Sequence, residues 1–160
     1  MGELRVRPAG PADAGFIRAA LDEFFGGTLV VSRGVLQDPT TQPGFVAELD
    51  GERIGFATYR IDGDECELTA IAALREGAGA GTALLAACAD AARAAGCRRI
   101  WLVTTNDNIH ALRFYQRRGW DIAALHRDAV TRSRALKPSI AFVGADGIPL
   151  RHELELELIL

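Results

Sequence analysis

Three glycines that alternate with small residues place the strongest constraint on this chain. Gly77, Gly79 and Gly81 are separated by alanines, and glycine is then absent from the next fourteen residues, which are mostly alanine and leucine. Glycine permits backbone angles and close approaches that a side chain forbids. A helix N-terminus offers unpaired N–H groups and the positive end of aligned peptide dipoles. The stretch therefore predicts a glycine turn that opens a long helix and binds an anion.

The length and the charge of the chain limit the number of domains and the class of ligand. The chain has 160 residues, of which 49% are hydrophobic and 24% charged, as expected for a single domain over residues 1–160. Its net charge of −3 gives no indication of nucleic acid as a partner. Residues 93–118 nevertheless contain six arginines and only one acid, Asp107. This basic stretch is either a site for a phosphorylated small molecule or a solvated arginine surface.

The three cysteines predict no disulfide framework and no metal site. Cys66, Cys88 and Cys97 are odd in number and lack metal-ligand spacing, and His126 and His152 have no partners at such spacing either. The chain shows no signal peptide and no apolar run long enough to span a membrane. We therefore expect reduced thiols, no metal, no membrane association and a cytoplasmic location.

The pattern of apolar residues and turn residues predicts a mixed fold. Strands are expected over residues 4–8, 45–49, 52–61, 65–74, 98–105, 120–125 and 152–158, and helices within residues 11–25, 82–95 and 106–118. An Asp50–Gly51 pair between apolar runs is a strong hairpin signal. Residues 26–44 are expected to form a loop or irregular helix, and residues 127–150 are rich in breakers. The order of elements predicts an α+β (mixed α/β) domain.

Two familiar phosphate loops are excluded. A Walker loop needs a lysine after its last glycine, and the only lysine of the chain is Lys137. The dinucleotide fingerprint needs G-x-G-x-x-G, whereas the spacing here is G-x-G-x-G. Antiparallel strands before the loop also disfavour a parallel βαβ unit.

Two segments together resemble the GCN5-related N-acetyltransferase (GNAT) family. "EGAGAGTALL" is similar to the family's Q/R-x-x-G-x-G/A loop, and "NIHALRFYQRRGW" is similar to its second signature, with the strand "RRIWLVTT" between them. The resemblance covers roughly residues 5–125. It implies a mostly antiparallel twisted sheet, splayed between its two middle strands, with helices on both faces. It also implies acetyl-CoA as co-substrate, with its pyrophosphate on the glycine loop.

The resemblance assigns the cofactor contacts to the strand before the loop, the loop itself and the helix of the second signature. These residues are Ile71, Ala72, Ala73, Glu76, Gly77, Ala78, Gly79, Ala80, Gly81, Thr82, Asn108, Ala111 and Phe114. Glu76 departs from the family pattern, because it stands where the family has glutamine or arginine. A carboxylate repels a pyrophosphate, so we expect Glu76 to turn away and the adjacent Arg75 to supply the positive charge.

Acyl transfer to an amine needs a base, a polarised carbonyl and an acid for the departing thiolate. By resemblance, Glu67 or Glu65 is the base, with Glu67 preferred, and Tyr115 is the acid. A backbone N–H around residues 71–73, where the strand bulges away from its parallel neighbour, would polarise the carbonyl. The alternatives are a solvated strand face for the glutamates and a packed aromatic for Tyr115. Asn108 is a pantetheine contact, a helix cap or both.

The acceptor is expected to be an amine-bearing small molecule or peptide, handled by a monomer or homodimer. The alternating "HELELEL" tail has an acidic face that suits a cationic amine, whereas Arg132, Arg134, Lys137 and Arg151 suit a carboxylate. Two other functions stay open. One is a non-catalytic CoA-binding sensor, and the other is an interaction domain whose tail is a charge-protected edge strand or part of a dimer sheet.

Overall fold

The computed structural model describes residues 2–160, which form two compact units. Among these residues, the first unit comprises 2–30, 38–100 and 160, and the second comprises 31–37 and 101–159. Both units combine helices with mainly antiparallel strands, which confirms the predicted α+β class. The expectation of a single domain over the whole chain stays a prediction.

The first unit contains a four-stranded antiparallel sheet in the order β1-β4-β5-β6. The hairpin predicted at Asp50–Gly51 is confirmed, because both residues have the positive φ angles, 52° and 82°, that a two-residue hairpin turn requires. The register of β5 with β6 shifts after Thr58, which leaves Thr69 of β6 without an opposite residue. The strands are β1 (Leu4–Pro8), β4 (Gly44–Leu49), β5 (Glu52–Asp62) and β6 (Glu65–Ala73).

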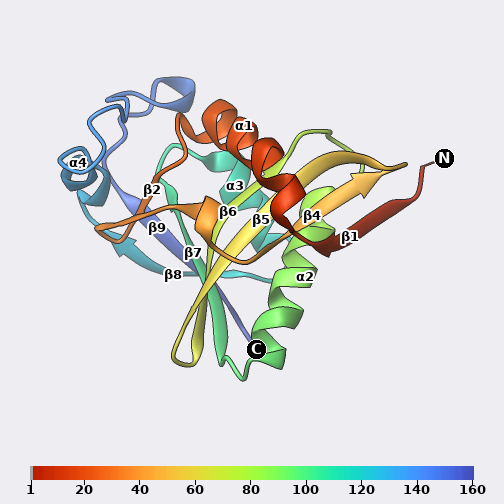
Figure 1. The fold of residues 1–160 in the computed structure, drawn as a ribbon. Coiled ribbons are helices and arrows are strands. Elements are labelled where there is room, and N and C mark those ends of the chain that lie inside the picture. Colours follow the sequence, from red (N-terminus) through yellow and green to blue (C-terminus); the bar gives the residue numbers. More distant parts are fainter. Residues whose placement is uncertain (1) are drawn as a thin grey trace. The chain divides into compact units, whose positions relative to one another are not determined.

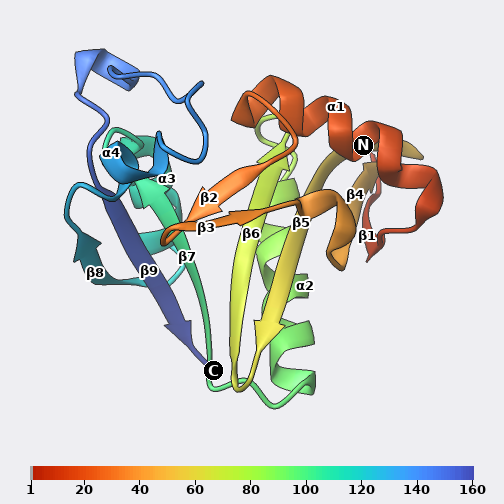
Figure 2. The same cartoon turned by 60° about the vertical axis from the view of Figure 1, so that its left-hand side comes forward.

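Two helices, α1 (Ala14–Phe25) and α2 (Ala80–Ala94), cover opposite faces of this sheet (Figure 2). One face presents Phe56 to Leu21 of α1 in the buried core. The next residue of β5, Gly55, points to the other face, where a Cβ would lie 3.2 Å from Leu84 of α2 and 2.8 Å from a backbone oxygen of β6. Glycine at this position therefore allows α2 to pack closely on the strands.

The second unit contains three further strands in the order β7-β9-β8, with β8 and β9 antiparallel (Figure 1). Because β9 lies between two other strands, the expectation that the acidic tail is an edge strand is wrong. The elements are β7 (Arg99–Thr105, of which residues 101–105 belong to this unit), α3 (Ile109–Gln116), β8 (Asp121–His126), α4 (Ala129–Ser133), a 3-10 turn (Ala145–Gly147) and β9 (Glu153–Ile159).

Residues 26–44 are more regular than the predicted loop or irregular helix. They contain a small hairpin of β2 (Val30–Ser32) and β3 (Val35–Gln37), followed by a 3-10 turn at Pro39–Thr41. The two turn residues, Arg33 and Gly34, have φ angles of 49° and 78°. The sequence prediction missed this hairpin because its strands are three residues long and Arg-Gly is not among the favoured turn pairs.

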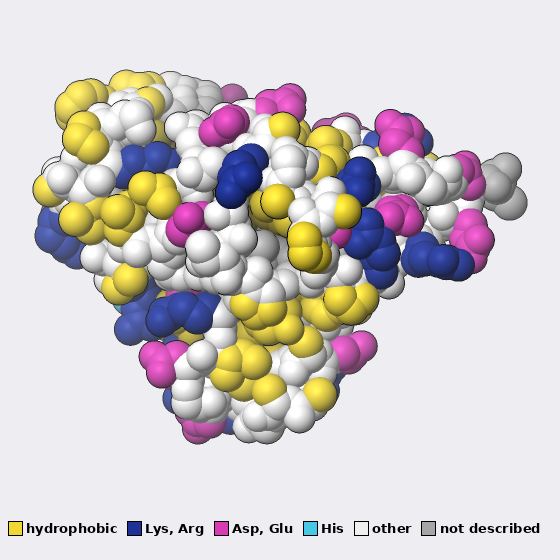
Figure 3. Space-filling view, viewed as in Figure 1, with side chains coloured by type: hydrophobic (Ala, Val, Ile, Leu, Met, Phe, Trp, Pro, Cys, Tyr) yellow, Lys and Arg dark blue, Asp and Glu magenta, His cyan; other side chains and the backbone are white. Residues whose placement is uncertain are grey.

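A network of ion pairs ties the start of the chain to the first sheet. Asp13, at the end of a 3-10 turn (Pro11–Asp13), accepts hydrogen bonds from the guanidinium groups of Arg7 and Arg53, and Arg7 also contacts Glu48 at 2.7 Å. The Asp13 side chain is only 1% exposed. Figure 3 shows the acidic and basic side chains that are interspersed where β1 lies. These arginines hold the pKa of Asp13 far below its usual range.

Candidate active site

The predicted glycine loop connects β6 to α2, as expected. Gly77 and Gly79 have φ angles of 76° and 80°, in the left-handed region that favours glycine, and Gly79 is the N-cap of α2. Gly81 lies inside the first helical turn and has no positive φ, so its backbone conformation does not require glycine. The backbone conformation of the loop therefore favours glycine at two of these three positions, Gly77 and Gly79.

The N-terminus of α2 is open to a ligand. Its N-cap is Gly79, which has no side chain to cap the helix, and among residues 2–160 a Cβ added at Gly77 would meet no heavy atom within 4 Å. The first N–H groups of a helix have no intrahelical acceptor, and the peptide dipoles make that end positive. Small residues around these groups, among them Ala78 and Ala80, leave room for the two phosphates of a pyrophosphate. The residues present therefore fit a diphosphate.

The charged residues of the loop point to solvent. Arg75 and Glu76 are both exposed, and Arg75 Nη2 lies 2.9 Å from Glu52 Oε2 on β5. An exposed ion pair of this kind contributes little to stability and exchanges readily with other partners. The expectation that Arg75 serves the phosphates, and that Glu76 turns away from them, stays a prediction.

The end of β6 supplies the other predicted cofactor residues of the first unit. Ile71, Ala72 and Ala73 are in regular register with Ala57, Phe56 and Gly55 of β5. Ala72 is buried, Ile71 is half-buried and Ala73 is exposed. On the β5 side the irregularity lies at Thr69, two residues earlier than the position where the sequence predicted a bulge away from the parallel neighbour. The predicted backbone N–H contact around residues 71–73 stays a prediction.

The two candidate bases on β6 lie in different surroundings. Glu65 faces two guanidinium groups, those of Arg98 at 3.3 Å and Arg99. Glu67 is 3% exposed, and its Oε1 lies 3.2 Å from Arg60 Nη2. Glu65 is thus engaged by two guanidinium groups, and Glu67 by that of Arg60. The burial of Glu67 contradicts the alternative in which it lies on a solvated strand face, and the preference for Glu67 as the base stays a prediction.

Helix α3 carries the residues of the second signature. Asn108 is the N-cap, since its side chain accepts a hydrogen bond from the N–H of Ala111 at 3.1 Å and donates one to Thr104 at 3.2 Å. Tyr115 is buried, and its ring packs edge-on against Phe114 at 5.2 Å and against Trp120 at 5.4 Å. The cap role of Asn108 is confirmed, and the ring of Tyr115 is held by aromatic packing. Their roles toward a coenzyme stay predictions.

The second unit also holds a cluster that the sequence prediction did not assemble. Glu153 and Glu155 of β9 are 3% and 6% exposed. Glu155 lies 2.9 Å from His126 Nε2, and Arg33, at the tip of the β2–β3 hairpin, contacts both glutamates and the ring of Trp101. We call these five residues the β9 cluster. The sequence identified the acidic row but gave no signal that joined Arg33 to it, because the hairpin was not recognised.

Two arginines of residues 127–151 contact other residues of the same stretch. Arg134 donates hydrogen bonds to the carbonyls of Ala141 and Leu150, at 2.6 Å and 2.8 Å, and stacks on Phe142. Arg151 pairs with Asp128 at 3.1 Å. A guanidinium that holds backbone carbonyls is committed to loop structure, so Arg134 is not available to bind a carboxylate of the acceptor.

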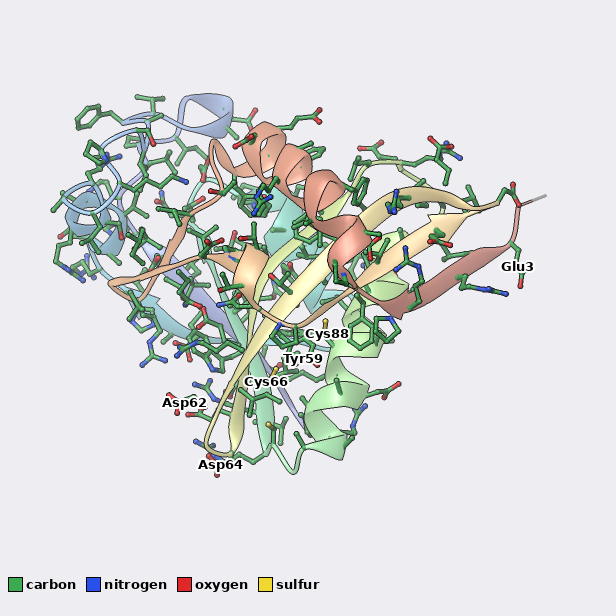
Figure 4. The ribbon with its side chains drawn as sticks, in the orientation of Figure 1. Glu3, Tyr59, Asp62, Asp64, Cys66 and Cys88 are labelled. Carbon is green, nitrogen blue, oxygen red and sulfur yellow. The ribbon has the colours of Figure 1, made fainter. Side chains whose placement is uncertain are left out.

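The three thiols are free, as expected, and all are buried. Cys66 on β6 and Cys88 on α2 point into the first unit beside Tyr59 (Figure 4). Burial raises the pKa of Cys66 and that of Cys88 to about 12, and it raises the pKa of Tyr59 as well. A thiol with so high a pKa is a poor nucleophile, so these cysteines are packing residues.

Among residues 2–160, no group of histidine, cysteine or acidic side chains is arranged to hold a metal ion. Within the same residues, no helix combines the length and the apolar character that a membrane crossing requires.

Comparison with known proteins identifies the class. Residues 15–120 match the model of the acetyltransferase (GNAT) family, and the chain belongs to this family. It is 40% identical over 126 residues to the uncharacterized protein YdhI of Bacillus subtilis, a match that covers 79% of each chain.

Solved structures share the fold. A Bacillus subtilis acetyltransferase in complex with CoA is 20% identical and superposes with a TM-score of 0.71, covering 99% of both chains. A GNAT acetyltransferase from Elizabethkingia anophelis with acetyl-CoA bound is 17% identical, with a TM-score of 0.71 and 98% of both chains covered. At these identities the likeness concerns the fold alone.

Proposed function

We propose that this protein is an acetyl-CoA-dependent N-acetyltransferase that acetylates a primary amine of a small molecule or peptide. The observation that carries the proposal is the N-terminus of α2, which begins at two glycines with positive φ, one of them its N-cap, in a chain of the GNAT family. Backbone N–H groups and the helix dipole together suit a pyrophosphate. When bound, acetyl-CoA supplies the acetyl group as a thioester. The proposal includes a cytoplasmic location and a monomeric or homodimeric state.

Glu67 is proposed to remove the proton from the acceptor amine, directly or through a water. A free alkylamine has a pKa near ~10.4 and is protonated at neutral pH, so its proton must be accepted before the nitrogen can attack. Arg60 lies 3.2 Å from one oxygen of Glu67 and is 40% exposed. In the proposal Arg60 orients the carboxylate toward the amine.

Tyr115 is proposed to donate a proton to the departing thiolate. A phenol has a pKa near ~10 and keeps its proton at neutral pH, as an acid in this step must. The rings of Phe114 and Trp120 fix the phenol in one orientation. Asn108, which caps α3, is proposed to contact the pantetheine through side-chain hydrogen-bonding capacity that the cap does not use.

The test is a screen of primary amines, amino acids and short peptides with acetyl-CoA. Free thiol and product mass are recorded together. We expect thiol release only with an accepting amine, in equal amount to the N-acetylated product. Gly79→Glu is the negative control, because it puts a carboxylate at the start of α2 and should abolish both signals. Binding of acetyl-CoA without amine-dependent thiol release across the panel would contradict the proposal and support a non-catalytic coenzyme-binding protein.

A further inference from the structure

The β2–β3 hairpin places a guanidinium on an aromatic and acidic surface of the second unit. The Cζ atom of Arg33 lies 4.8 Å from the centroid of the Trp101 ring, and its Nη1 lies 3.7 Å from Glu155 Oε1. The backbone N–H of Arg33 donates a hydrogen bond to Glu153 at 3.1 Å. An aromatic face beside a carboxylate attracts cations through the ring quadrupole and through opposite charge. The β9 cluster is therefore a cation site that already holds a cation.

The carboxylates of the β9 cluster and the arginine that contacts them differ in their exposure to solvent. The carboxylates of Glu153 and Glu155 are almost fully buried, whereas the side chain of Arg33 is 45% exposed. A buried carboxylate is costly unless a cation accompanies it. The cation in this case enters from the solvent side, at the tip of a small hairpin. A cationic group from solution can therefore replace it and satisfy the same carboxylate.

The turn itself does not explain the presence of arginine. Arg33 is the first residue of a two-residue turn in which both φ angles are positive, and asparagine, aspartate or glycine is favoured at that position. A long side chain there carries a conformational penalty that the backbone does not require. The contact with Trp101 and Glu155 gives Arg33 a reason to occupy the turn.

The residue before Arg33 is also a buried polar residue. The hydroxyl of Ser32, which precedes Arg33, is buried and has no hydrogen-bond partner among residues 2–160. A buried hydroxyl without a partner loses the hydrogen bonds that it makes with water in the unfolded chain. Ser32 thus retains hydrogen-bonding capacity in the same hairpin that carries the replaceable cation.

We propose that the β9 cluster is the acceptor-recognition site and selects an amine that carries a second positive group, a guanidinium or an ammonium, for which Arg33 is the internal stand-in. The acceptor's cation takes the place of the Arg33 guanidinium on Trp101 and Glu155. The acceptor role of the cluster rests on the proposed function, but the binding of a cation to the cluster does not depend on turnover. Of the two interpretations that the sequence left open, a cationic acceptor and an acceptor with a carboxylate, the proposal selects the cationic one.

The binding test uses two ligands of nearly the same shape. Agmatine carries a primary amine and a guanidinium, whereas 4-aminobutylurea carries the same amine and a neutral urea. Calorimetric titration of each into the full chain, without acetyl-CoA, measures the contribution of the second charge. We expect agmatine to bind about tenfold more tightly, since a desolvated cation gains both the ring and the carboxylate. Equal binding of the two ligands would overturn the proposal.

Three variants localise the effect. Glu155→Gln keeps the size of the side chain and should remove the preference for agmatine. Arg33→Asn installs a favoured turn residue and removes the competing cation, so agmatine should bind several-fold more tightly. Arg151→Asn is the matched control, because Arg151 is also a surface arginine paired with an acid, and it should change neither affinity. Weaker agmatine binding in Arg33→Asn would contradict the stand-in role.

Turnover separates this inference from the proposed function. If amines are acetylated but agmatine has no advantage over 4-aminobutylurea in KM, the acetyltransferase proposal stands and the acceptor site is wrong. If no amine is acetylated but agmatine binding still depends on Glu155, the cation site stands and the proposed reaction is wrong.

Discussion

Asp13 in the first unit and Glu155 in the second are buried carboxylates that each form ion pairs with arginine. The two differ in how closely the guanidinium groups approach the carboxylate. Asp13 accepts four hydrogen bonds at 2.8 Å, two from Arg7, one from Arg53 and one from the N–H of Gly10. Glu155 has His126 Nε2 at 2.9 Å and the guanidinium of Arg33, on a hairpin turn, at 3.7 Å. The short bonds to Asp13 join β1, α1 and β5. The longer contact at Glu155 leaves a cation that can exchange.

Buried carboxylates of the first kind stabilise the fold, whereas those of the second kind are available to a ligand. A carboxylate whose lone pairs are filled by rigid strands is part of the scaffold. A carboxylate that meets a half-exposed arginine from a turn keeps its preference for cations while its occupant can leave. Matched substitutions test this distinction.

The two tyrosines provide the largest expected contrast. Tyr115→Phe removes the proposed acid and should lower kcat by roughly 10²–10⁴-fold, towards the lower end because a thiolate leaves readily, while acetyl-CoA affinity persists. Tyr59→Phe removes the same single oxygen from a tyrosine of the first unit, beside Cys66 and Cys88, and should leave kcat within about twofold. Steady-state kinetics of both variants make the comparison. Equal losses in the two would make Tyr115 a structural residue.

The two carboxylates should differ in their effect on stability. Asp13→Ala leaves two arginines without their shared partner and should lower the free energy of unfolding by about 3–5 kcal/mol. Glu155→Gln retains the volume and an acceptor oxygen, and should lower it by about 1 kcal/mol or less. Urea denaturation measures both values. A larger loss in Glu155→Gln than in Asp13→Ala would reverse the assignment of scaffold and site.

The scaffold role of Asp13 also predicts a pH dependence. The arginines hold the pKa of Asp13 below its unfolded value of ~3.9, so its stabilisation is fully present above that pH and is lost as the pH falls towards the folded pKa. Asp13→Asn cannot lose a charge. The stability difference between the original chain and Asp13→Asn should therefore be about 1.5–3 kcal/mol at pH 7 and shrink below pH 4. A difference that is the same at pH 7 and pH 3 would contradict this role.

The smallest expected effect concerns the thiols, which should hardly react with a thiol reagent in the native chain. With pKa values of about 12 for Cys66 and Cys88, almost no thiolate is present at pH 8, and both sulfurs are buried. The native chain should react with an aromatic disulfide reagent far more slowly than the chain in urea. Rapid labelling of either thiol in the native chain would show that the first unit opens readily.

The sequence predicted the features that depend on local chemistry. The Asp50–Gly51 hairpin, the glycine turn into α2 and the Asn108 cap each follow from what a single residue type permits, and the structure contains all three. The β2–β3 hairpin escaped prediction because its turn begins with arginine, chosen for a contact with Trp101 that is distant in sequence. The burial of Glu153 and Glu155 escaped for the same kind of reason, since alternation shows which residues share a face and not what covers that face.

The most direct test of the account concerns the glycine loop and the diphosphate. Calorimetry compares the affinity of CoA with that of pantetheine, which lacks the diphosphate and the nucleotide, in the original chain and in Gly79→Glu. We predict that the original chain binds CoA more than about tenfold more tightly than pantetheine, because charge-assisted hydrogen bonds contribute ~1.5–3 kcal/mol each. Gly79→Glu should remove this difference in affinity, and Glu155→Gln should retain it. Undiminished CoA binding by a folded Gly79→Glu variant would contradict the account.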